Sequence, residues 1–150
     1  MAGSFSDPME KYVLDNCFGQ NTTRLSTGGL GTLYIALLES TADNANDTWD
    51  VGSTGECPGS TYARKGFTNS SSMWCNTTAG TGVKKLKKSI VVTTAAGSDW
   101  GTIGYFTICS SGTTGTGGFT LCWTSLTGGA KVINSGDSIT VTTALSITLG

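Results

Sequence analysis

The chain contains no histidine, so the main candidates for chemistry in this sequence are its carboxylates, lysines and cysteines. Without an imidazole, the usual Ser-His and Cys-His nucleophile pairs cannot form. No GxSxG motif is present, so no nucleophile elbow is expected. The Gly-rich stretches at 28–31 and 115–118 lack the Lys-Ser/Thr of a phosphate loop and are interpreted as turns. We therefore expect no enzymatic activity and no cofactor.

The carboxylates could pair for glycoside hydrolysis or bind a cation. The candidates for hydrolysis lie in a long loop and in turns, and are Asp43, Asp47, Asp50, Glu56, Asp99 and Asp137. A calcium ion could be held by Asp43, Asn46, Asp47 and Asp50. However, the DxDxDG order and the closing glutamate of a calcium-binding loop are missing. Asp and Asn are favoured in turns because their side chains bond the local backbone, and we prefer that interpretation. No metal site is therefore predicted.

Five cysteines stand at positions 17, 57, 75, 109 and 122, without any CxxC spacing. A zinc site is not expected, since the ligand spacing is wrong and imidazole is absent. Two interpretations stay open, namely buried small apolar side chains and disulfides formed in an oxidising medium after cell lysis. If the hairpin over 102–126 turns near 115–116, Cys109 and Cys122 face each other and form the candidate disulfide.

A basic run surrounds Leu86 and consists of Lys84, Lys85, Lys87 and Lys88. The first interpretation is a solvated strand edge, where lysines block unwanted strand pairing. The second is a contact with an acidic neighbouring protein, so the four lysines are partner-contact candidates. Nucleic acid is a poorer partner, because the run contains no aromatic residue or arginine.

A short helix is predicted near the N-terminus, because Ser6 is a good N-cap and Pro8 suits the first turn. Met9, Tyr12 and Val13 give this helix an apolar stripe that could dock on a neighbouring subunit.

A long polar loop is predicted over 40–60, and loops of this length inside a domain are usually functional or mobile. Trp49 lies within it and is a further candidate for a partner contact, because tryptophan is enriched at interface hot spots.

The remaining sequence predicts strands rich in β-branched and aromatic residues and separated by Gly, Thr and Ser. Their expected ranges are 32–39, 61–68, 73–76, 89–94, 102–110 and 119–126, with two more in 131–150. This spacing indicates an all-β fold, an antiparallel β-sandwich or jelly-roll-like barrel with one short N-terminal helix. We expect a helix and connector arm over 1–30 and a single β-sandwich domain over 31–150.

Charge and composition limit the partners of the protein. Charged residues make up 13% of the chain and the net charge is −1, which argues against dedicated binding to nucleic acid or a membrane surface. The N-terminus lacks the basic and apolar regions of a signal peptide, so we expect synthesis in a host cytoplasm.

Several blocks resemble, in the same order, those of a family of small bacteriophage virion structural proteins of the LYVALSTADP…GYAR type. The blocks are LYIALLESTADNAND at 33–47, STYARKGFTN at 60–69, DWGTIGYFTIC at 99–109, GGFTLCWTSLT at 117–127 and VINSGDSITV at 132–141. The resemblance implies a β-rich, non-enzymatic head-decoration or tail-fibre-like protein. The basic run and the cysteines at 57, 75, 109 and 122 depart from that pattern.

The sequence thus predicts a virion surface protein, with three alternatives for its role. The first is a capsid decoration (cement) protein, a homotrimer that stabilises the head by binding the major capsid protein. The second is a structural component of the tail, neck or fibre base, which binds other virion proteins. The third is a carbohydrate-binding module that uses the long loop and Trp49.

Overall fold

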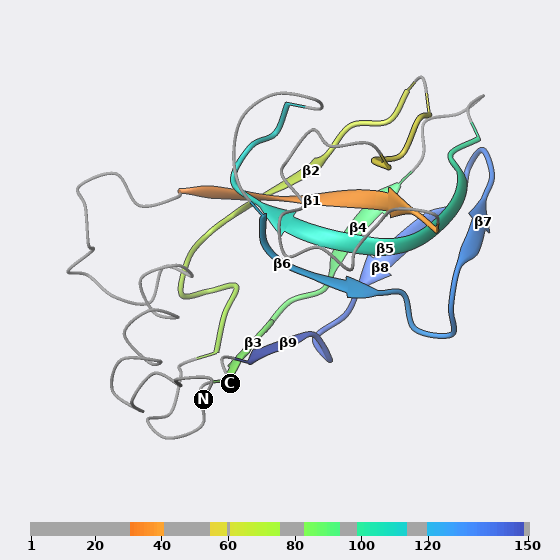
Figure 1. Ribbon diagram of the computed structural model, residues 1–150. Coiled ribbons are helices and arrows are strands. Elements are labelled where there is room, and N and C mark those ends of the chain that lie inside the picture. Colours follow the sequence, from red (N-terminus) through yellow and green to blue (C-terminus); the bar gives the residue numbers. More distant parts are fainter. Residues whose placement is uncertain are drawn as a thin grey trace, which may run out of the picture. The chain divides into compact units, whose positions relative to one another are not determined.

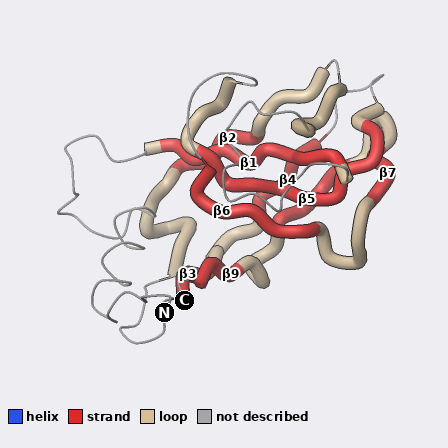
Figure 2. Tube along the Cα trace, in the orientation of Figure 1, coloured by secondary structure: helices blue, strands red, loops and turns tan. Residues whose placement is uncertain are grey.

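Figure 1 shows the computed structural model of the chain, which describes residues 31–40, 55–59, 61–75, 83–93, 99–113 and 120–148. All regular elements within these ranges are strands (Figure 2). They are β1 (Thr32–Glu39), β2 (Lys65–Thr68), β3 (Val83–Lys85), β4 (Ile90–Thr93), β5 (Gly101–Cys109), β6 (Thr120–Ser125), β7 (Lys131–Ile133), β8 (Ser138–Val141) and β9 (Ser146–Thr148).

The predicted all-β class is confirmed for these residues, and the strands form antiparallel sheets. One sheet has the order β2-β1-β5-β6, with β7 also paired to β5, and the pairs β3-β9 and β4-β8 form two smaller sheets. The finer expectation of a sandwich or jelly-roll-like barrel stays a prediction. The expected N-terminal helix lies outside the described residues.

The described residues fall into two compact units. The main unit comprises the described parts of 33–67 and 91–140, and the small unit comprises those of 31–32, 68–90 and 141–148. The single domain expected over 31–150 stays a prediction.

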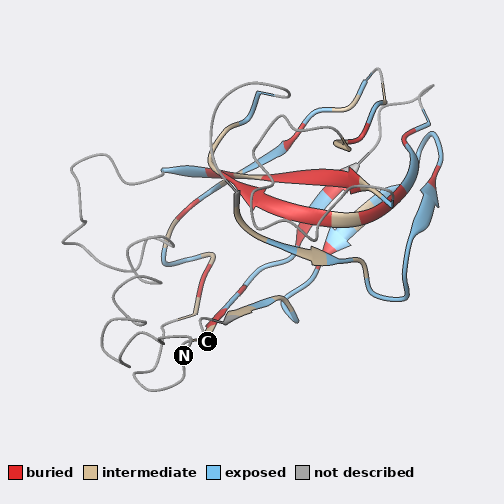
Figure 3. Cartoon of the chain, viewed as in Figure 1, coloured by how far each residue is buried: buried red, intermediate tan, exposed pale blue. Residues whose placement is uncertain are grey.

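Strand β1 forms the centre of the main unit together with β5. Leu33, Ile35 and Leu37 are fully buried, and so are Ala36 and Leu38 on the opposite face of the strand. Burial on both faces is the outcome predicted from the apolar run LYIALL, because a half-exposed strand would alternate with polar residues. Figure 3 shows this core as the buried stretch of β1 and β5.

Strands β5 and β6 form the predicted hairpin, but its register differs from the expectation. Cys122 stands opposite Ile108, and Cys109 stands opposite Thr120. The ladder is interrupted between Ile108 and Cys109, and such a bulge adds a residue to one strand. The prediction that Cys109 and Cys122 face each other was therefore wrong, and both are free thiols in this structure.

The small unit is built around Trp74, which is fully buried. Its indole Nε1 donates a hydrogen bond to Asn69 Oδ1 at 3.0 Å, and its backbone forms an isolated bridge with Leu86. The strand expected over 73–76 is thus reduced to this bridge. Strand β3 pairs with β9, where Lys84 stands opposite Ile147.

Candidate functional site

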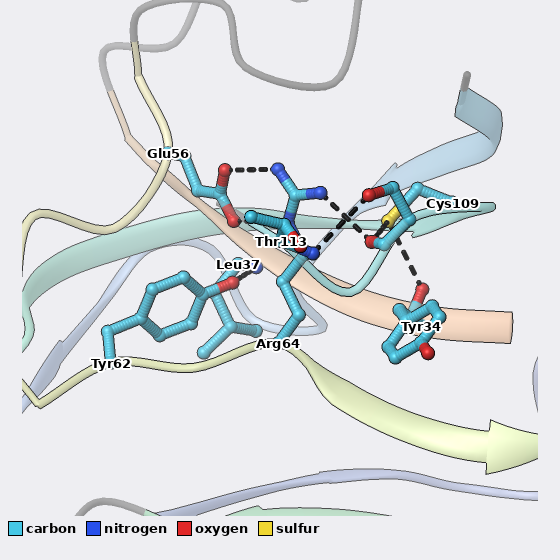
Figure 4. Close-up of polar contacts among 8 residues, drawn as sticks. Tyr34, Leu37, Glu56, Tyr62, Arg64, Cys109 and Thr113 are labelled. Atoms are coloured by element: carbon cyan, nitrogen blue, oxygen red, sulfur yellow. Dashed lines mark hydrogen bonds and ion pairs between the residues drawn. The ribbon is translucent and has the colours of Figure 1, made fainter. Parts of the chain in front are cut away.

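A connected polar group among the described residues of the main unit is centred on Arg64, and we call it the Arg64 cluster (Figure 4). Its members are Tyr34, Glu56, Tyr62, Arg64, Cys109 and Ser111. Arg64 Nε donates to Glu56 Oε1 at 2.7 Å, and Nη2 donates to Oε2 at 2.6 Å. The two side chains are 0% and 6% exposed, so this bidentate ion pair is buried.

Backbone contacts with β1 position the carboxylate of this pair. Leu38 forms a bridge with Glu56, Glu39 N–H donates to Gly55 O at 2.7 Å, and Cys57 N–H donates to Leu37 O at 2.9 Å. Segment 55–57 is therefore held along the end of β1. Arg64 comes from the chain just before β2, and its Nη1 donates to Ser111 O at 2.9 Å. The ion pair consequently ties three segments to one another.

Tyr62 attaches the same region to the backbone of β1. Its hydroxyl oxygen accepts a hydrogen bond from Leu37 N–H at 2.8 Å, and its ring meets Trp100 edge-on at a centroid distance of 5.4 Å. Burial raises the pKa of Tyr62 far above its ordinary value, and the neighbouring Glu56 carboxylate acts in the same direction. Tyr62 is therefore a neutral phenol that serves packing.

The thiols near this cluster are held in their protonated form. Cys109 Sγ lies 3.5 Å from both Tyr34 O and Ser111 O, and Cys57 Sγ donates to Trp100 O at 3.6 Å. Burial raises the pKa of both thiols, and it raises the pKa of Cys122 to about 12. Since the thiolate is the nucleophile, these cysteines are poor nucleophiles at neutral pH.

Two of the candidate carboxylates bond backbone groups: Asp137 bonds its own turn, as the turn interpretation predicted, whereas Asp99 bonds a segment 36 residues away in the sequence. Asp99 Oδ1 accepts from Ser135 N–H at 2.8 Å, and Asp137 Oδ2 accepts from Asn134 N–H at 2.9 Å. Glu56 belongs to the ion pair instead. The other candidate carboxylates and the suggested calcium ligands lie outside the described residues. Within the described ranges, no group of three or more Cys, Asp or Glu side chains is arranged to hold a metal ion.

The four lysines of the basic run differ in their exposure. Lys85, Lys87 and Lys88 are exposed, whereas Lys84 is fully buried. Both interpretations of the run required accessible side chains, so they were wrong for Lys84. The physical reason is the alternation of a strand, which turns Lys84 inward and Lys85 outward on β3. Lys87 Nζ donates to Ser71 O at 3.1 Å.

The other partner-contact candidates, Met9, Tyr12, Val13 and Trp49, lie outside the described residues. The sequence analysis did not single out Trp123. Its side chain is 39% exposed on β6 and meets Tyr105 edge-on at a centroid distance of 6.0 Å. No signal in the sequence could have found it, because its exposure follows from the position of β6 at the end of the described strand order.

Sequence and structure comparisons were made with known proteins. The family model described as podophage GP4 fiber I protein gp80 matches residues 4–149. No curated protein and no solved structure matches the chain. The described residues contain no helix with the length and apolar character needed to cross a membrane.

Proposed function

Since the chain belongs to the podophage GP4 fiber I protein family, we propose that it is a structural subunit of a fibre on a podophage virion. The observation that carries this proposal is the family match, which includes every described strand. The proposal selects the second role expected from the sequence, a tail, neck or fibre-base component. Capsid decoration through the major capsid protein is the competing role in the same virion.

The Arg64 cluster supports a structural role for the main unit. Its charged groups bind each other and the backbone, and its thiols are protonated, so the described polar groups are engaged in holding loops to a sheet. A fibre subunit needs a rigid framework of this kind because it works by position and contact. Fold alone does not distinguish a fibre from a shell, and the location on the particle decides between them.

The test is the location and copy number of the protein on purified particles. Quantitative mass spectrometry against the major capsid protein gives the copy number, and antibody labelling viewed by electron microscopy gives the position. We expect few copies, with label on fibres. Label spread over the head at a copy number close to that of the capsomers would overturn the fibre role and support decoration.

Carbohydrate binding by the long loop is a separate prediction, because Trp49 lies outside the described residues. A glycan array of the whole protein beside its Trp49→Ala variant tests it. Binding that the substitution abolishes is the expected result of this alternative, and an array without any signal would remove it.

A further inference from the structure

Among the described strands, β6 is the last in the order of its sheet. The order β2-β1-β5-β6 leaves one side of β6 without a partner strand among the described residues (Figure 1). Its residues with described side chains are half-buried or exposed (Figure 3). A strand edge of this kind presents a row of N–H and C=O groups that another strand can bind.

The hydrogen-bond pattern identifies which groups of β6 point outward. Leu126 N–H donates to Gly104 O at 2.9 Å, so these two residues form a hydrogen-bonded pair with β5. Because bonded and non-bonded pairs alternate along an antiparallel ladder, the next non-bonded pairs are Tyr105–Ser125 and Thr107–Trp123. The backbone N–H and C=O groups of Trp123 and Ser125 therefore point away from β5.

Within the part of the chain that the structure describes, the outer edge of β6 carries none of the sequence features that usually protect a strand edge against pairing. Natural edge strands are blunted by short length, lysines or proline. The other edge strand, β2, has four residues and carries exposed Lys65. Strand β6 has six residues, TLCWTS, without charge or proline. Its bulge lies at the Thr120 end and leaves the register from Cys122 to Ser125 regular.

We propose that the outer edge of β6 pairs with β6 of a second copy of this chain. In an antiparallel pair with its two-fold axis at Thr124, the outward groups of Trp123 stand opposite those of Ser125 in the other copy. Each such pair exchanges both of its N–H···O=C bonds. The edge is self-complementary, as a two-fold interface requires, and it brings no like charges together.

This interface favours a dimer over the homotrimer expected from the sequence. The dimer proposal rests on the sheet alone and holds whether the protein lies on a fibre or on the head. A test of the dimer is consequently independent of the location on the particle that the test of the proposed function measures.

The test is the oligomeric state of the full chain in solution. Sedimentation velocity measures its mass over a concentration series that reaches about 100 µM. We expect a dimer. Ser125→Pro removes an outward N–H without removing a bond to β5, and should weaken dimerisation by about tenfold or more. The matched control Ser125→Ala keeps the N–H and should dimerise like the parent protein.

A second variant tests the same edge in case the Ser125→Pro variant does not fold. Trp123→Lys places a charge on the edge at an exposed position and should also weaken the dimer, whereas Val132→Lys, at another exposed apolar position, should not. Thermal unfolding followed by circular dichroism verifies that each variant is folded. A monomeric or trimeric parent protein, or a dimer unchanged in a folded Ser125→Pro or Trp123→Lys variant, would overturn the proposal.

Discussion

At the residue scale, the buried Arg64–Glu56 ion pair is the feature whose contribution to stability can be tested by substitution. Removing both charges from water is costly, and the bidentate geometry with the additional bond to Ser111 O offsets that cost. The pair therefore adds little net stability compared with an apolar pair of the same shape. Its importance is that either partner alone would be a buried, uncompensated charge.

We predict that Arg64→Met lowers the free energy of unfolding by about 3–5 kcal/mol, because it leaves the Glu56 carboxylate buried without its partner. Denaturant unfolding followed by tryptophan fluorescence measures the change. The double variant Glu56→Gln with Arg64→Met should recover part of the loss. A loss below about 1 kcal/mol for Arg64→Met would show that the pair is solvated.

The raised pKa values of Cys57, Cys109 and Cys122 lead to a prediction about their reactivity. A raised pKa means that less thiolate is present at neutral pH, and burial raises the pKa of all three of these thiols. We expect slow alkylation of Cys57, Cys109 and Cys122 by iodoacetamide in the folded protein and rapid alkylation after unfolding, read by peptide mass spectrometry. The rate for Cys122 should rise as the pH rises.

The same alkylation experiment without reductant determines whether Cys109 and Cys122 form a disulfide. Free Cys109 and Cys122 should both be alkylated after unfolding, since the register places neither opposite the other. A peptide linking them, recovered only without reductant, would contradict the thiols of this structure and support the pairing expected from the sequence.

At the element scale, the close approach of β5 to the end of β1 depends on a glycine. A Cβ on Gly104 would lie 2.7 Å from Ser40 Cα, a contact that backbone atoms cannot relieve without moving. Ser40 N–H is also bound to Thr102 O at 3.0 Å, so the two segments are already held together.

We predict that Gly104→Ala lowers the free energy of unfolding by about 1–3 kcal/mol through this overpacking. Denaturant unfolding measures the change. Gly31→Ala is the matched control, because its Cβ would meet no atom within 4 Å, and a smaller loss is expected there. Equal losses at the two positions would contradict crowding against Ser40 as the cause, because Gly→Ala at an open position reduces the entropy of the unfolded chain and by itself does not destabilise the fold.

The strands show where sequence patterns succeed. The apolar run of β1 and the β-branched arms of β5 and β6 predicted these strands almost to the residue. The pairing of Cys109 with Cys122 failed because the regular register already places Cys122 opposite Ile108, and the irregularity after Ile108 then places Cys109 opposite Thr120. No residue pattern in the two arms fixes that register.

At the scale of the whole molecule, low charge and an open strand edge lead to one further expectation. The net charge is −1 and β6 carries none of it, so the proposed dimer is held by backbone bonds and apolar contacts. We predict that its dissociation constant changes less than about threefold between 50 mM and 500 mM NaCl, because salt screens only charged contacts. Sedimentation velocity across the salt series checks this, and a steep dependence would place the lysines at the interface.

The sequence by itself determined the all-β class, the doubly buried β1 and the hairpin of β5 and β6, because these follow from local periodicity and turn composition. The ordered blocks also predicted a phage virion structural protein, in agreement with the family match. Only the tertiary structure decided that Glu56 meets Arg64, that Lys84 is buried and that Trp123 stands on an open edge. Those outcomes depend on contacts between distant segments and on strand order, which residue types and their spacing do not encode.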